Sequence, residues 1–306
     1  MTRPSSPPAN WLGGIREFLE MIKVSHTLFA MPFAIGALFL ANRDLAIGAM
    51  DLMTLLIQVV VAVALARTSA MSFNRWADRK IDALNPRTSG RSIPAGRLGA
   101  STVLWWTVCS GAGFVAVTAT INPLALKLSP VVLLIILGYS WTKRFTSLCH
   151  MVLGLGLALA PIGAWVAVRG TLLEASGGID PVPWILGGSV LLWTAGFDIL
   201  YACQDHQFDL QQRLHSIPTR FGIATALRLS RLLHILMVGL LVALSKQAQL
   251  GVPFAIAIAI VSLLLVAQHR RVKADDLTRI QGSFFTLNAI ISSILMIALM
   301  VEGWSG

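Results

Sequence analysis

Charged residues are scarce in this chain: they make up 12% of its 306 positions, against about 25% in an average soluble domain. Acidic residues are the scarcer kind, with 14 Asp and Glu against 24 Lys and Arg. Cysteine is rare too, and Cys109, Cys149 and Cys203 form no CxxC pair. These shortages argue against an ordinary soluble domain, a disulfide-stapled fold and a cysteine metal site.

Apolar residues are abundant instead, at 56% of the chain, and they gather in runs of about 20 residues. A helix of that length crosses a bilayer hydrocarbon core about 30 Å thick. The sequence therefore predicts an all-α integral membrane protein with about nine transmembrane helices in a bundle. The predicted spans are 25–41, 52–74, 101–120, 124–141, 148–168, 182–203, 224–245, 251–268 and 284–301.

The beginning of the chain has a different composition from the rest. It is polar and rich in proline, which predicts a flexible tail over residues 1–14. The next segment, IREFLEMIK at 15–23, is amphipathic and is expected to lie along the membrane interface. Residues 15–306 are then expected to form one membrane domain.

The distribution of Lys and Arg predicts how the protein is oriented. The tail and the loops after spans two, four, six and eight hold 19 of the 24 basic residues, whereas the opposite loops hold four. Because basic loops stay in the cytoplasm, we predict a multi-pass plasma or inner membrane protein with a cytoplasmic N-terminus and an external C-terminus. The net charge of +10 then reflects topology, not binding to nucleic acid.

Two short acidic stretches stand out against this apolar background. The first contains Asn74, Asp78 and Asp82, and the second contains Asp198, Tyr201, Asp205 and Asp209. Residues four apart share one face of a helix, so each stretch is expected to form a stripe of oxygen ligands. Facing stripes would repel each other without a hard divalent cation, and Mg²⁺ is the cation that prefers carboxylates and is shared with substrate phosphates. The alternative is carboxylates at helix ends, neutralised by neighbouring arginines.

The two stretches also belong to an internal repeat. Asn74, Asp78 and Asp82 align with the later stretch at an offset of 127, and the segment Ser92–Pro94 recurs as Ser216–Pro218. Four predicted spans separate the copies, so the repeats are parallel. We expect repeat one over 25–141, repeat two over 148–268 and an extra helix over 284–301.

Cationic and aromatic residues near the stripes suit an anionic lipid substrate. The candidates for binding a lipid diphosphate are Arg67, Arg79, Lys143 and Arg144, and Tyr139 and Tyr201 are candidates for hydrogen bonds to phosphate oxygens. Their alternative interpretations are structural pairing, a positive-inside flank and aromatic membrane anchors. His150, His206 and His215 have no mutual metal spacing and are interpreted as structural or loop residues.

At these residues the chain resembles the UbiA family of intramembrane aromatic prenyltransferases. The family's NxxxDxxxD motif is Asn74, Asp78 and Asp82, preceded by Arg67. Its RTxxRxxPxG loop, its YxxxKR element and its DxxYAxxDxxxD motif are matched by Arg87–Gly96, Tyr139–Arg144 and Asp198–Asp209. The last motif resembles the 4-hydroxybenzoate polyprenyltransferase branch, whereas RTSAMSFN and FTSLCH are closer to a sister group with possible dihydroxynaphthoate acceptors.

The resemblance implies a reaction and a role for each residue. A polyprenyl group would pass from its diphosphate to a ring carbon of an aromatic acid, with membrane lipid around the prenyl tail. Asn74, Asp78 and Asp82 would hold one Mg²⁺, and Asp205 and Asp209 a second. Arg79, Lys143 and Arg144 would bind the diphosphate; Asp198 would orient or deprotonate the acceptor phenol; and Arg67 would bind diphosphate or the acceptor carboxylate.

Other classes of protein fit the sequence less well. A transporter with a duplicated bundle would place its ionisable residues near the membrane midplane, not at one interface. A membrane CDP-alcohol phosphotransferase would need a DGxxAR signature, which the chain lacks. A scaffold would give no reason for paired acidic stripes. Within the family that the chain resembles, the alternatives are a terpene cyclase or another class of acceptor.

Overall fold

The computed structural model describes residues 11–21, 29–45, 47–272 and 283–304. These residues form helices joined by short loops, apart from an isolated bridge between Leu173 and Ile179. The helices are α1 (Trp11–Met21), α2 (Met31–Asn42), α3 (Ala49–Leu84), α4 (Ala100–Ile121), α5 (Pro123–Thr142), α6 (Cys149–Arg169), α7 (Pro181–Ala202), α8 (His206–Gln211), α9 (Ile217–Phe221), α10 (Ile223–Gln247), α11 (Val252–Arg271) and α12 (Ser283–Trp304).

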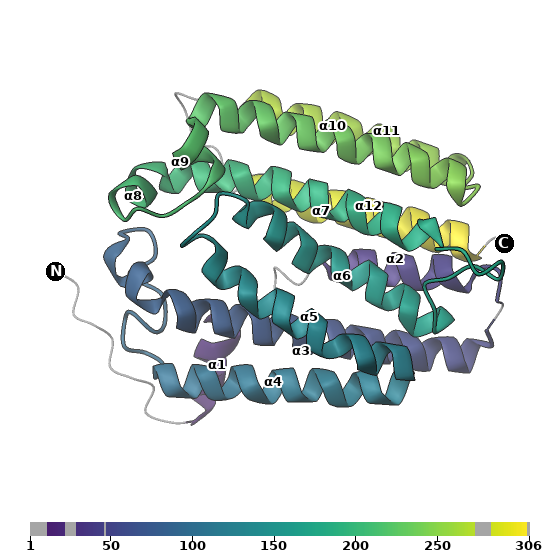
Figure 1. The fold of residues 1–306 in the computed structure, drawn as a ribbon, viewed down its shortest axis with the longest axis horizontal. Helices are drawn as coiled ribbons and strands as arrows, with labels where there is room; N and C mark the ends of the chain where they lie inside the picture. The colour runs from purple at the N-terminus through teal and green to yellow at the C-terminus, as the bar shows by residue number, and fades with distance from the viewer. Residues whose placement is uncertain (1–10, 22–28, 46, 273–282, 305–306) are drawn as a thin grey trace.

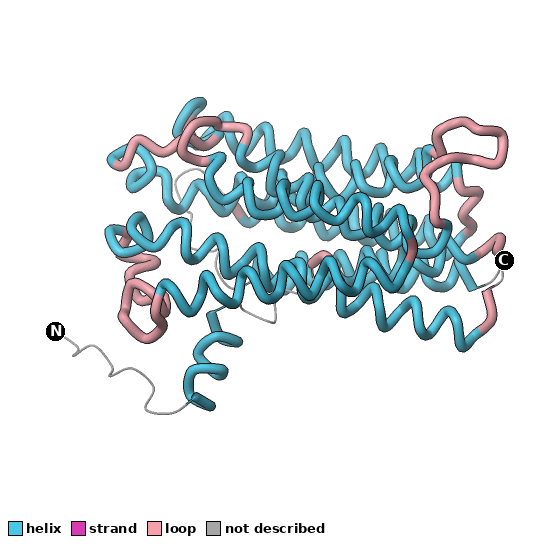
Figure 2. The backbone as a smooth tube through the Cα atoms, turned by 60° about the horizontal axis from the view of Figure 1, so that its bottom comes forward, coloured by secondary structure: helices cyan, strands magenta, loops and turns pink. Residues whose placement is uncertain are grey.

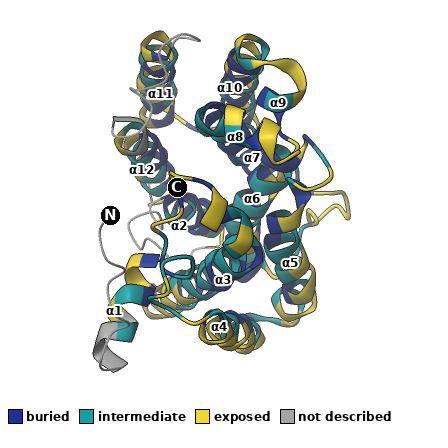
Figure 3. Ribbon diagram, turned by 90° about the vertical axis from the view of Figure 1, so that its left-hand side faces the viewer, coloured by how far each residue is buried: buried dark blue, intermediate teal, exposed yellow. Residues whose placement is uncertain are grey.

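Within the described residues, eight helices are long and apolar enough to cross a membrane. They lie side by side in one bundle, with loops gathered at its two ends (Figures 1 and 2). Large apolar side chains such as Leu134, Ile235 and Leu263 are exposed, as expected for contact with lipid. Figure 3 shows exposed positions along the outward faces of the outer helices, such as α4, α5 and α10. The prediction of a multi-pass all-α membrane protein is confirmed.

The first predicted membrane span, 25–41, differs from the helix that the structure shows there. Of residues 25–41, those up to 28 lie outside the described part, and α2 has only 12 residues, about 18 Å at 1.5 Å per residue. Residues 1–10 of the predicted tail also lie outside it, and α1 begins at Trp11, four residues before the predicted interfacial segment.

The helix boundaries follow local chemistry. α4 and α5 separate at Asn122, whose side chain accepts a hydrogen bond from the backbone N–H of Ala125, while Pro123 occupies the first helical position. α3 runs without interruption for 36 residues, about 54 Å, which is longer than the hydrocarbon core. Its last turns, which carry the first acidic stretch, therefore extend to the end of the bundle.

The most buried helix is α7, which packs between α6 and α10. Its Trp193 is fully buried and contacts the rings of Phe29, Phe33 and Phe197, with centroid distances of 6.1, 5.3 and 5.0 Å. This packing fixes the direction of α7. It brings the C-terminal end of α7, with α8 and α9, to the same end of the bundle as the C-terminus of α3 (Figure 1).

Two glycines of α6 serve different purposes. A Cβ at Gly154 would lie 2.5 Å from the carbonyl oxygen of Leu191 in α7, so Gly154 permits close contact between the helices. A Cβ at Gly163 would meet no atom within 4 Å, and Gly163 lines a cavity. The segment 154–163 therefore provides both close helix approach and open space.

We expect Gly154→Ala to lower the stability of the detergent-solubilised protein by about 1–3 kcal/mol, because the added methyl group overlaps the α7 backbone. Gly163→Ala is the matched control in the same helix and should be neutral or slightly stabilising. Thermal unfolding followed by tryptophan fluorescence measures both variants. Equal melting temperatures for the two variants would contradict the close contact at Gly154.

Candidate active site

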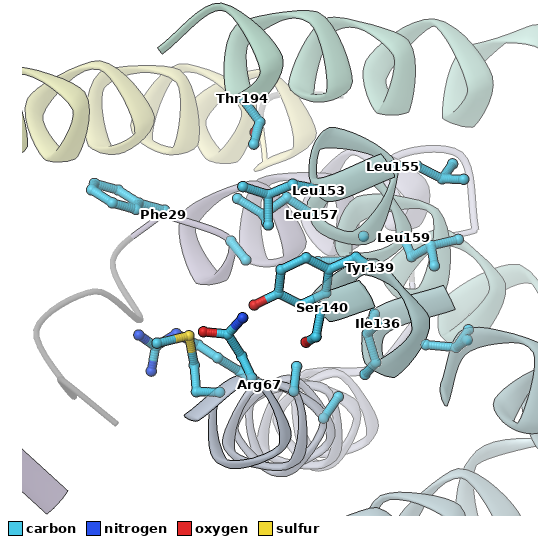
Figure 4. A pocket seen from close by; sticks show the side chains of 18 of the residues that line it. Phe29, Arg67, Ile136, Tyr139, Ser140, Leu153, Leu155, Leu157, Leu159 and Thr194 are labelled. Carbon is cyan, nitrogen blue, oxygen red and sulfur yellow. The ribbon is translucent and has the colours of Figure 1, made fainter. Parts of the chain in front are cut away.

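A cavity of about 750 Å³ runs through the half of the bundle that contains α3, α5, α6 and α7. Its wall on α3 extends from Val59 to Asp82, a rise of about 35 Å at 1.5 Å per residue. Most of the charged side chains line the end near the C-termini of α3 and α7, while mostly apolar side chains line the remainder. Figure 4 shows Tyr139 of α5 extending between Arg67 and the leucines of α6. This combination suits a ligand with an anionic head and a long apolar tail.

The first acidic stretch lies on one face of α3, as predicted. Asn74, Asp78 and Asp82 all line the cavity, and the side-chain amide of Asn74 donates to Asp78 Oδ2 at 3.0 Å. The side chain of Asp82 is buried. Arg67 lines the same cavity two turns deeper in the bundle.

The second stretch is not the single helical stripe that the spacing predicts. α7 ends at Ala202, a 3₁₀ turn spans Cys203–Asp205, and α8 begins at His206. Asp198 and Tyr201 belong to α7, whereas Asp205 lies in the 3₁₀ turn and Asp209 on α8. All four residues nevertheless line the cavity.

Each of the four aspartates near the mouth is paired with its own basic side chain. Nη1 of Arg91 lies 2.7 Å from both carboxylate oxygens of Asp82, and Nη2 of Arg144 lies 3.2 Å from Asp78 Oδ1. Across the mouth, Nε of Arg87 lies 2.8 Å from Asp205 Oδ1, with a second bond from Nη2 to Oδ2, and Nζ of Lys143 lies 2.8 Å from Asp209 Oδ1. The Arg87 pair connects the loop that follows α3 to the turn that follows α7. The two sequence repeats therefore meet in one site.

The pKa values of Lys143 and Arg87 show the effect of their aspartate partners on the second stretch. Burial by itself would lower the pKa of Lys143, but the charge and hydrogen bond of Asp209 outweigh it and raise that pKa. The pKa of Arg87 is likewise raised, because its bonds to Asp205 outweigh its burial. Both cations stay charged at neutral pH. While Asp209 is ionised, the stability that the raised pKa of Lys143 contributes is fully present below the unfolded-state pKa of about 10.4 and is lost as pH rises through the raised folded-state value.

The loop after α3, which supplies Arg87 and Arg91, is held in place by contacts with α1. Glu17 of α1 accepts hydrogen bonds from Ser92 Oγ at 2.6 Å and from Arg97 Nε at 2.7 Å. Phe18 of α1 stacks on Trp106 of α4 with a centroid distance of 4.6 Å. The amphipathic segment predicted to lie along the membrane interface thus supports the wall of the cavity mouth.

Arg79 is the predicted site residue that the structure does not bring to the cavity. Its guanidinium lies over the Trp76 ring at 4.7 Å and donates to the Trp76 carbonyl at 2.6 Å. Because these contacts hold it against Trp76, the Arg79 guanidinium does not line the cavity. The other predicted residues, including Tyr139, Lys143 and Arg144, all line the cavity.

Sequence reasoning missed several residues of this site. Arg75, Asn85, Arg87, Arg91 and His150 line the cavity but were not candidates. Two of them, Arg87 and Arg91, stand in the RTxxRxxPxG loop, so the motif itself carried the signal. No sequence signal pointed to His150, because its partner Asp198 lies 48 positions away.

Comparison with known proteins identifies the class. Residues 29–290 match the model of the UbiA prenyltransferase family, so the chain belongs to that family. The 4-hydroxybenzoate octaprenyltransferase of Vibrio cholerae serotype O1 is 32% identical over 284 residues, which cover 92% of this chain and 95% of the relative. The protein of the same description from Aeromonas hydrophila is 32% identical over 252 residues, covering 81% and 82%. The protein is a prenyltransferase.

Solved structures agree in fold. The apo structure of a UbiA homolog from Aeropyrum pernix K1 has a TM-score of 0.81 at 31% identity, covering 91% of this chain and 98% of that chain. A UbiA homolog from Archaeoglobus fulgidus bound to DMAPP and Mg²⁺ has a TM-score of 0.68 at 19% identity, covering 94% and 98%.

The chemistry of the donor set fits a hard divalent cation. Among the described residues no cluster of three or more His, Cys, Asp or Glu side chains is preassembled around a metal position. The fully buried Asp209, however, has a carboxylate oxygen, Oδ2, that accepts no hydrogen bond in the described structure. Such an oxygen is costly unless a cation or a donor reaches it. Oxygen ligands from Asn74, Asp78, Asp82, Asp205 and Asp209 are the type that Mg²⁺ prefers.

We expect Lys143→Met to destabilise the protein by roughly 3–5 kcal/mol at neutral pH, because it leaves the Asp209 carboxylate buried without its cation. The double variant Lys143→Met/Asp209→Leu should recover most of that loss, since neither charge remains. Chemical unfolding in detergent gives the three free energies. A double variant no more stable than Lys143→Met alone would show that the pair is not what stabilises this corner.

Proposed function

We propose that this prenyltransferase moves a polyprenyl group from polyprenyl diphosphate to a ring carbon of an aromatic acid, and that the acid is 4-hydroxybenzoate, in respiratory quinone biosynthesis. One observation carries the proposal: a mouth of paired acidic and basic side chains opens into a long apolar cavity. The names of the Vibrio and Aeromonas relatives support the choice of acceptor. An alternative is the same chemistry on a dihydroxynaphthoate for menaquinone.

The basic side chains at the mouth are the groups that bind the diphosphate. Lys143, Arg144, Arg87 and Arg91 each neutralise one aspartate. With a metal-bound diphosphate in the mouth, the aspartates would have the metal as their partner, and the basic groups would be available to the phosphate oxygens. The site therefore keeps its charges balanced in both states. Tyr139 and Tyr201 add hydroxyl donors from the cavity wall.

Mg²⁺ is the proposed cofactor, and the DMAPP- and Mg²⁺-bound relative from Archaeoglobus supports it. Asn74, Asp78 and Asp82 would hold one ion, and Asp205 and Asp209 a second. Bound there, Mg²⁺ would supply positive charge that makes the diphosphate a better leaving group.

The remaining residues direct the transfer. The bond between the prenyl C1 and the diphosphate oxygen breaks with its electron pair on the diphosphate, and the ring carbon ortho to the acceptor hydroxyl forms the new bond to C1. That ring carbon then gives its proton to the released diphosphate, which restores the aromatic ring. The apolar wall around residues such as Ile136 and Leu157 excludes water, which would otherwise quench the allylic cation. Asp198 accepts a hydrogen bond or proton from the acceptor phenol, and Arg67 binds the acceptor carboxylate or the diphosphate.

We further propose that the mouth faces the cytoplasm and that the protein resides in the plasma or inner membrane. The excess of basic residues in the loops at this end supports that orientation. In intact cells, an impermeant maleimide should label Ser176→Cys in the opposite loop and leave Ser89→Cys unlabelled; the reverse pattern would refute the orientation.

The test is a transfer assay in membranes with labelled geranyl diphosphate and a panel of aromatic acids. We expect prenylated product with 4-hydroxybenzoate, and a loss of at least 100-fold in Asp78→Asn and Asp205→Asn, because each removes a charged ligand. Asp44→Asn is the control, since Asp44 lies at the other end of the bundle and pairs with Arg169. If product formed only with a dihydroxynaphthoate, that compound would be the acceptor instead of 4-hydroxybenzoate. Product with no acid, or normal turnover in both site variants, would refute the proposed function.

A further inference from the structure

His150 contacts the proposed acceptor base. It lies in the first turn of α6, and its Nδ1 is 2.7 Å from Oδ2 of Asp198 on the neighbouring α7. The His150 side chain is almost completely buried, with 3% of its surface exposed, whereas the Asp198 side chain retains 29%. Both residues line the cavity. A buried ring therefore holds a carboxylate that remains open to the cavity.

The other ring nitrogen determines the tautomer. Nε2 of His150 lies 3.2 Å from the backbone nitrogen of Ile217, and a backbone N–H can only donate. Nε2 must then accept, which leaves the ring proton on Nδ1, where it is donated to Asp198. A doubly protonated imidazolium would point an N–H at the N–H of Ile217. The geometry therefore specifies a neutral imidazole with its proton on Nδ1.

The donor on Ile217 is itself fixed by the repeated Ser-Ile-Pro segment. Ser216 caps α9: its Oγ accepts from the N–H of Thr219 at 3.2 Å, and the Thr219 hydroxyl accepts from the N–H of Ser216 at 2.8 Å. Ile217 occupies the first helical position, where a backbone N–H has no acceptor within its own helix. This N–H is thus free to bind His150. The capping box fixes the ring, and the ring fixes Asp198.

We propose that His150 is a positioning residue that, as the neutral Nδ1–H tautomer, holds Oδ2 of Asp198 so that Oδ1 faces the acceptor phenol. This rests on the proposed function of Asp198. Within the described structure, Oδ2 is the only oxygen of Asp198 with a hydrogen-bond partner, so Oδ1 is available to the substrate. A carboxylate held at one oxygen presents the other in a single direction, as productive proton transfer requires.

The test compares His150→Gln with His150→Leu. Glutamine is uncharged and carries a donor and an acceptor, so it can satisfy both Asp198 and Ile217, whereas leucine satisfies neither. In the geranyl transfer assay, His150→Leu should lose about 10- to 100-fold in kcat/KM for the aromatic acid, the usual cost of removing an outer hydrogen-bond partner. The kcat/KM of His150→Gln for the aromatic acid should stay within about threefold of the value for the unmodified protein, because glutamine keeps both hydrogen bonds. The KM for geranyl diphosphate should change little in either.

His234→Leu is the matched control. His234 is as deeply buried as His150, but it lies on α10, bonds His269 and the Trp193 carbonyl, and does not line the cavity. Its loss should lower the stability of the protein without changing the KM for the aromatic acid relative to the KM for geranyl diphosphate. Normal acceptor kinetics in His150→Leu, or a His150→Gln variant as impaired as His150→Leu, would overturn the positioning role.

A spectroscopic measurement separates this inference from the function it rests on. In protein labelled with ¹⁵N-histidine, the ring signals absent from His150→Gln belong to His150, and their shifts should report a neutral ring protonated at Nδ1. A cationic ring, or a proton on Nε2, would overturn the inference whether or not transfer is observed. Failure of the unmodified protein to prenylate any acid would instead refute the proposed function and leave the spectroscopic result to stand independently.

Discussion

The site depends on the cost of placing carboxylates at the edge of an apolar bundle. Four aspartates converge there, and each would destabilise the fold without a positive partner. The structure meets this cost with one basic side chain for each carboxylate. The same basic groups are the ones that a diphosphate needs. A single arrangement of charges therefore stabilises the mouth and, under the proposed function, would also suit an anionic substrate that arrives with its metal.

Much of the remaining architecture serves to hold those pairs together. The length of α3 carries the first stretch to the end of the bundle, and the deep packing of α7 around Trp193 brings the second stretch to meet it. The loop after α3 crosses from one stretch to the other through Arg87, and α1 supports that loop through Glu17. Below the mouth the cavity is apolar over most of its length, which suits a prenyl chain.

Residue spacing predicted the parts of this arrangement that follow from local periodicity. The apolar runs predicted the membrane helices, the predicted break between spans 101–120 and 124–141 was confirmed, and Asn74, Asp78 and Asp82 lie on one helical face as expected. The same rule was wrong for Asp205 and Asp209, because the helix ends at Ala202 and the chain turns. Contacts between distant segments, such as Arg87 with Asp205 and His150 with Asp198, have no local pattern and became visible only in three dimensions.

The central claim is that the aspartates exchange their basic partners for Mg²⁺ when diphosphate binds. Calorimetric titration of geranyl diphosphate into the purified protein, in Mg²⁺ and in EDTA, tests this most directly. The account predicts tight binding with Mg²⁺ and an affinity at least 100-fold weaker in EDTA, because the basic groups then remain on the aspartates. Equal affinity in both solutions would contradict it.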